Sequence, residues 1–197
     1  MDKISIRAKG FLESPQYLKA DLLEDFEVEL DSSDKILTVF HKLNSDTIEL
    51  IFSEALAIFS RNRTENELWK INFREFENFL RDENHLPAFE ESSELLEEKL
   101  IKIKISLIAC LIKKRMKADF AKLEEGISHW GNLNLTSRNI WAKDFLSVLG
   151  WELIFCNEDS LTVTKAPPGL ANESLEFLFQ KIFRQGVQGI PMKVVAV

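Results

Sequence analysis

The sequence predicts an α+β fold with four or five helices, two short antiparallel β-hairpins and a possible C-terminal strand. Apolar residues recur at helical spacing in several separate segments, and two other segments alternate apolar and polar residues around polar turns. Hydrophobic residues make up 45% of the chain and charged residues 29%, a composition typical of globular proteins. These observations together favour a folded α+β chain over a disordered one.

The N-terminal part of the chain is expected to be mostly β-structure. Residues 3–10 (KISIRAKG) could open the chain with a short strand. In residues 26–43, apolar residues alternate with Glu27 and Glu29, DSSD supplies a turn, and β-branched and aromatic residues follow. This second segment predicts a β-hairpin whose outer face carries the two glutamates.

Two helices are expected after this hairpin. Residues 48–59 place apolar side chains at helical spacing behind Asp46, which can cap the helix N-terminus. Residues 64–84 predict a second single helix. Its apolar stripe consists of Trp69, Phe73, Phe76 and Leu80.

A long central helix is predicted for residues 93–117. Two neighbouring apolar stripes cover more than half of its circumference. The stripes are Leu96, Leu100, Ile103, Leu107 and Leu111, and Ile101, Ile105, Ile108 and Ile112. Lys99, Lys102 and Lys104 interrupt the run, whereas a membrane-spanning helix needs roughly 20 mostly apolar residues. The segment therefore predicts a helix buried by its neighbours and no membrane span.

The C-terminal part is expected to add further helices and a second hairpin. Residues 117–126 either continue the central helix or begin another one, and Thr136 or Ser137 is expected to cap the next helix. The remaining predicted elements are a helix over 138–149, a hairpin over 151–165, a helix over 175–186 and an apolar end at 189–197. This end is expected to dock as a strand or to contact a partner, because apolar termini are rarely left in water.

The charge is distributed unevenly between an acidic half and a basic half. Residues 1–98 hold 11 Lys and Arg against 23 Asp and Glu, a balance of −12, whereas residues 99–197 hold 14 against 9, a balance of +5. No linker rich in Gly, Pro and Ser interrupts the middle of the chain. A single compact domain over residues 1–197 is therefore expected.

No catalytic, metal or cofactor motif is recognisable. Cys110 and Cys156 are far apart and belong to no CxxC pair, and the three histidines are dispersed, so no metal-ligand spacing is present. The seven glycines form no nucleotide-binding loop. Isolated cysteines and an N-terminus without an apolar signal segment favour a cytoplasmic location.

Two alternative functions depend on particular residues. An enzyme would use His85 as a general base with Cys156 or a nearby carboxylate. A nucleic-acid module would use Lys113 to Lys117 and residues 118–165, whose order of helix, loop, helix and hairpin resembles a winged helix, with Arg138 on the would-be recognition helix. Acidic residues on the would-be wing disfavour phosphate contacts in this second case.

The leading hypothesis is a non-catalytic protein-binding function, as an adaptor, accessory subunit or chaperone-like protein, and an oligomer in solution is compatible with it. An apolar groove with acidic surroundings would hold a basic or amphipathic segment of another protein. The 15 Phe residues exceed what a small core obviously needs, so a minority of them is expected at a partner surface. The candidate contact residues are Trp130, Glu27, Glu29, Lys113, Lys114, Arg115 and Lys117. The basic cluster among them could instead pair with the acidic half of the same chain.

Overall fold

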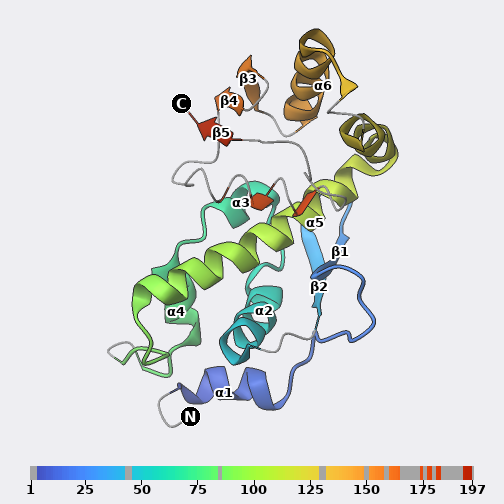
Figure 1. Cartoon of the computed structure of the whole chain (residues 1–197). Coiled ribbons are helices and arrows are strands. Elements are labelled where there is room, and N and C mark those ends of the chain that lie inside the picture. Colours follow the sequence, from blue (N-terminus) through green and yellow to red (C-terminus); the bar gives the residue numbers. More distant parts are fainter. Residues whose placement is uncertain are drawn as a thin grey trace. The chain divides into compact units, whose positions relative to one another are not determined.

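A computed structural model of the chain confirms the α+β class (Figure 1). It describes residues 4–42, 46–83, 86–128, 132–148, 151–157, 160–164 and 193–196, together with five single positions between 174 and 182. The chain divides into two compact units, Met1–Ile108 and Ala109–Val197. The expectation of one compact domain stays a prediction, and each unit is described by itself.

The first element is helix α1 (Ile6–Glu13), so the expectation of an opening strand was wrong. Ser5 caps the helix, and its hydroxyl oxygen accepts a hydrogen bond from the amide of Ala8 at 3.1 Å. The carboxylate of Asp82 accepts hydrogen bonds from the amides of Ile6 and Arg7. These amides belong to the first helical turn, which has no acceptors of its own. A residue 76 positions away supplies one acceptor, and a local sequence pattern cannot reveal it.

The expected first hairpin is present as antiparallel strands β1 (Phe26–Leu30) and β2 (Ile36–His41). The carboxylate of Asp31 accepts hydrogen bonds from the amides of Ser33 and Lys35, at 2.7 and 2.9 Å, and thereby holds the turn. Asp34 takes a positive φ of 58°, which Asp tolerates better than most residues. The inward side chains are all buried: Phe26, Val28, Ile36, Val39 and His41.

Helix α2 (Thr47–Phe59) packs against both β2 and α1. Asp46 caps it as expected, and its carboxylate accepts hydrogen bonds from the amides of Ile48 and Glu49 at 2.9 and 3.1 Å. Every residue from 50 to 57 is buried. A helix enclosed on all sides forms the centre of the first unit.

The single helix expected over residues 64–84 is instead two short helices, α3 (Glu65–Trp69) and α4 (Phe73–Leu80). The expected helix is interrupted at Asn72. Its side chain caps α4 by accepting a hydrogen bond from the amide of Glu75 at 2.9 Å. The ammonium of Lys104 donates to the carbonyl oxygen of Ile71 at 2.9 Å in the same break. Two sets of polar contacts therefore override the continuous helical pattern.

The predicted long helix is α5 (Ser93–Ser128), which continues beyond residue 117 (Figure 1). The residues of both predicted stripes are buried, except Ile101, which is half-buried. The part of α5 up to Ile108 belongs to the first unit and contacts α2 and the α3–α4 break through Lys99 and Lys104. None of the helices in the described part of the chain is long and apolar enough to cross a membrane.

Aromatic rings fill the core of the first unit. The ring of Phe52 packs edge-on against Phe76 and Phe89, with centroids 5.3 and 5.4 Å apart. Phe59 contacts Phe76 and Phe79 in the same cluster. The large apolar side chains that are exposed among the described residues are all Leu and Ile. The expectation that some Phe rings lie at a partner surface therefore finds no support within the described residues.

The second unit contains α6 (Leu135–Val148) and the expected second hairpin, β3 (Glu152–Cys156) and β4 (Ser160–Thr164). Asn134 caps α6 by accepting a hydrogen bond from the amide of Ser137 at 2.9 Å, so the expected caps at Thr136 or Ser137 were placed too late. The terminal strand is β5 (Lys193–Ala196), which pairs with β4 in parallel. Ser174, Phe177, Leu178, Lys181 and Ile182 are helical, in agreement with the helix expected there. The described part of the chain thus forms six named helices, rather than four or five, and five strands.

Candidate functional site

The outer face of the first hairpin carries the two glutamates that the alternation predicted. Glu29 is exposed and Glu27 is half-buried, whereas their neighbours Phe26 and Val28 are buried. The ammonium of Lys19 lies 2.7 Å from the Glu27 carboxylate and 5.7 Å from the centre of the Phe40 ring. This hydrogen bond raises the pKa of Lys19. One of the two glutamates is therefore partly neutralised within the chain, and the other points to solvent.

Further carboxylates surround these strands, and together they form what we call the acidic surface, residues 21–37. Between residues 21 and 37 the chain holds seven acidic residues and one basic residue, Lys35. Two leucines in this segment are unusually exposed for their type, Leu23 at 87% and Leu37 at 49%. Exposed large apolar side chains in a segment whose charge is mostly of one sign are typical of surfaces that bind another molecule.

Behind the same hairpin lies a buried contact between a histidine and a glutamate that the sequence analysis missed. His41 at the end of β2 and Glu54 in α2 are each 1% exposed, and the ring Nε2 of His41 lies 2.6 Å from the Glu54 carboxylate. The amides of Gln16 and Tyr17 also donate to this carboxylate. A carboxylate within the apolar run of α2, and a histidine at an inward strand position, were the signals that could have indicated it.

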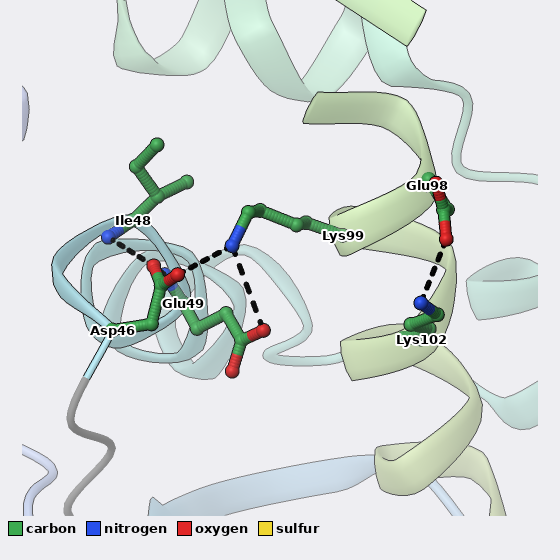
Figure 2. Close-up of polar contacts among 6 residues, drawn as sticks. All are labelled: Asp46, Ile48, Glu49, Glu98, Lys99 and Lys102. Atoms are coloured by element: carbon green, nitrogen blue, oxygen red, sulfur yellow. Dashed lines mark hydrogen bonds and ion pairs between the residues drawn. The ribbon is translucent and has the colours of Figure 1, made fainter. Parts of the chain in front are cut away.

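The beginning of α5 is tied to the beginning of α2 by a second, more accessible ion pair (Figure 2). The Lys99 ammonium lies 2.5 Å from the Asp46 carboxylate and 3.7 Å from that of Glu49. The hydrogen bond to Asp46 raises the pKa of Lys99, while burial opposes the shift. Burial acts to raise the pKa of Asp46, but hydrogen bonds from Lys99 and from the α2 amides lower it overall. The pair attaches the beginning of α5 to the beginning of α2.

Lys104, which interrupts the apolar stripes of α5, is only 6% exposed. Its ammonium donates to the carbonyl oxygens of Ile71 and Trp69, at 2.9 and 3.4 Å. Burial lowers the pKa of Lys104. The residue satisfies the carbonyl groups at the end of α3, which explains a lysine in an apolar helix face.

The residues of the enzyme alternative are only partly described. Cys156 is buried, and its thiol donates to the carbonyl oxygen of Asn157 at 3.6 Å. Burial raises the pKa of the Cys156 thiol, although Arg138 acts in the opposite direction. The thiolate is the nucleophilic form, so this environment works against a nucleophilic role. His85 lies outside the described residues, and the proposed pairing of the two stays a prediction.

The basic cluster lies in α5 beyond the boundary between the two units. Lys113 and Lys114 are half-buried and Arg115 is exposed. The side chain of Lys117 is outside the described set, as is the whole of Trp130. Neither the partner role of these residues nor the alternative pairing with the acidic half is tested.

The order of elements that suggested a winged helix is present, with α5, α6 and the β3–β4 hairpin following one another. On α6, Lys143 and Asp144 are both exposed and Arg138 is half-buried. Asp144 lies next to Lys143 on this helix, so its exposed side carries both signs of charge and lacks the uniformly positive potential that phosphate binding needs. The nucleic-acid alternative stays a prediction. The described residues also contain no group of three or more His, Cys, Asp or Glu that could hold a metal ion.

Comparison of the chain with protein-family models finds no match. Comparison with curated proteins finds none, and neither does comparison with solved structures. The chemistry of the side chains described above is what supports a function for this chain.

Proposed function

We propose that the chain is a non-catalytic protein-binding adaptor, accessory subunit or chaperone-like protein. It holds a basic, amphipathic segment of a partner protein against the acidic surface, in the reducing environment of the cytoplasm. The observation that supports this most is the acidic surface itself, in which exposed Glu29 lies in the same segment as the exposed leucines Leu23 and Leu37.

The two kinds of side chain would contribute differently to binding. Burying a leucine contributes roughly 1.5–3 kcal/mol, so Leu23 and Leu37 would supply most of the affinity by lining an apolar groove for the partner. The carboxylates would attract lysines and arginines over a distance and exclude acidic segments. A partner helix or strand with apolar residues on one side and basic residues on the other satisfies both requirements.

The proposal is tested by isothermal titration of the full chain with a lysine-rich amphipathic peptide. The variant Asp21→Lys/Glu29→Lys reverses two exposed charges of the acidic surface, and we expect it to bind at least about tenfold more weakly at low salt. The affinity of the wild-type chain is expected to fall as the salt concentration rises, because exposed charges are screened.

The matched control is Glu91→Lys/Glu97→Lys, which makes the same change in net charge at two exposed positions outside the acidic surface. This control is expected to bind nearly as tightly as the wild-type chain. An equal loss in both variants would show that net charge alone attracts the peptide. Such a loss, or no binding to the wild-type chain at all, would contradict the proposal.

A further inference from the structure

The segment of residues 16–19, here called the strap, is attached to the buried His41–Glu54 pair from the N-terminal side. The amide of Tyr17 donates to the Glu54 carboxylate, and so does the amide of Gln16. The backbone of the strap also pairs with β2: the amide of His41 donates to the carbonyl oxygen of Tyr17, and the amide of Lys19 donates to that of His41, both at 2.9 Å. The strap, β2 and α2 therefore meet at one histidine and one glutamate.

The hydrogen-bond partners of the His41 ring define how many protons it carries. Nδ1 lies 3.1 Å from the carbonyl oxygen of Lys42, which can only accept, so Nδ1 must carry a proton to make this bond. Nε2 lies 2.6 Å from the Glu54 carboxylate. The backbone amides of Gln16 and Tyr17 already donate to this carboxylate, and such bonds favour its ionised, accepting form. With acceptors on both sides, the geometry points to a ring that donates from both nitrogens, which is an imidazolium.

We propose that the His41–Glu54 pair is a buried imidazolium–carboxylate latch that fastens the strap to β2 and α2, and that loss of the ring proton releases the strap. A neutral ring would leave a nitrogen lone pair facing either the Lys42 carbonyl or the Glu54 carboxylate, both of which repel it. The latch is closed while the ring is charged and opens as rising pH removes its proton.

Other charged groups near the latch are occupied elsewhere. On the strap, the Lys19 ammonium binds Glu27 of β1, and the Tyr17 hydroxyl accepts a hydrogen bond from Arg61. In α2, Glu49 lies near Lys99. Next to the ring in sequence, the side chain of Lys42 is exposed. Among the described residues, the charged side chain that contacts the His41 ring directly is therefore that of Glu54.

The charge of the ring can be measured directly by nitrogen-15 NMR of the imidazole. The chain has three histidines, so the variant His85→Asn/His129→Asn leaves His41 as the single signal. At neutral pH we expect both ring nitrogens of His41 to be protonated, with the Nε2 proton protected from exchange with water. A ring with one unprotonated nitrogen at neutral pH would overturn the proposal. This measurement leaves both His41 and Glu54 unchanged, so it does not depend on the folding of a variant of the latch.

The release of the strap is measured by amide hydrogen exchange across the alkaline titration of the ring. The protection of the Gln16 and Tyr17 amides is expected to fall about tenfold relative to that of Ser60, whose amide bonds within α2. Unchanged relative protection while the ring loses its proton would contradict the latch.

The variant Glu54→Gln provides the control for this second measurement. The amide oxygen of Gln can accept from the strap, and its NH2 group can donate to Nε2 of a neutral ring. We expect the ring of this variant to carry a proton on Nδ1 alone and the strap to stay protected over the same pH range. A strap that opened with the wild-type pH dependence in Glu54→Gln would show that another group controls it.

Discussion

Glutamates lie on both sides of the β1–β2 hairpin, and their different surroundings give them different roles. On the inner side, Glu54 of α2 is sealed from water and accepts hydrogen bonds from His41 and from two backbone amides. On the outer side, Glu29 is exposed and Glu27 is half-buried. A buried charge must be fully paired to be tolerated, whereas an exposed charge contributes little to stability and remains available to a partner.

Helix α5 repeats this contrast along one element. Lys104 is buried and donates to two carbonyl oxygens, Lys99 is partly accessible and bound to Asp46, and Lys102 is exposed beside Glu98. Substitutions at these positions are therefore expected to cost less stability as the side chain becomes more accessible.

The largest effect is expected for Glu54→Ala. This change leaves the His41 ring and two strap amides buried without their acceptor, which costs about 3–5 kcal/mol of unfolding free energy. Urea denaturation followed by circular dichroism measures it. Glu29→Ala on the outer face is the matched control and should change the unfolding free energy by no more than about 0.5 kcal/mol. Similar losses in both variants would mean that the two faces do not differ as described.

A smaller effect is expected for Lys104→Met, which keeps the length of the side chain and removes the donor to the carbonyl oxygens of Ile71 and Trp69. Buried acceptors left without a donor cost about 1–3 kcal/mol. Denaturation at neutral pH measures this cost, and Lys102→Met at the neighbouring exposed position should have almost no effect. A stable Lys104→Met protein would show that the carbonyl groups do not need the lysine.

The difference in unfolding free energy between the wild-type chain and Lys104→Met should also depend on pH. Burial lowers the pKa of Lys104 in the folded chain, so above that folded value the unfolded chain binds more protons. The unfolding free energy should therefore rise with pH between the folded pKa of Lys104 and the usual lysine value of 10.5. Subtracting the Lys104→Met curve from the wild-type curve isolates this rise. A difference that falls with pH would contradict the burial of the ammonium.

The smallest effect is expected for Asp46→Asn, which preserves the cap of α2 and removes the charge that binds Lys99. Partly exposed ion pairs contribute about 0.2–1 kcal/mol, so the loss should lie in that range. The pKa of Asp46 is lowered in the folded chain, so its contribution is complete above 3.8 and disappears as the pH falls through the folded pKa. Acid titration of both proteins should show this component in the wild-type chain alone, and its presence in Asp46→Asn would assign it to another group.

Periodicity was sufficient to predict the elements in which burial follows a regular pattern. The two stripes of α5 and the alternation in β1 are of this kind, because each side chain's position depends on its neighbours along the same element. The class of fold and the outward position of Glu29 follow from these patterns.

Contacts between distant segments explain the features that the sequence patterns did not predict. Asp82 supplies an acceptor for α1, and Lys104 completes the break between α3 and α4; both act across more than 30 residues. The pairing of Glu27 with Lys19 depends in turn on the strap, which β2 positions through His41. Such contacts depend on the finished tertiary structure, so local spacing alone cannot indicate them.

The most direct test of the binding function is an NMR titration of the labelled chain with a lysine-rich amphipathic peptide. We predict that the largest chemical-shift changes occur at the amides of Leu23, Glu27 and Glu29, and that added salt reverses them. Changes centred on Lys143 of α6, or no changes at any peptide concentration, would contradict a binding role for the acidic surface.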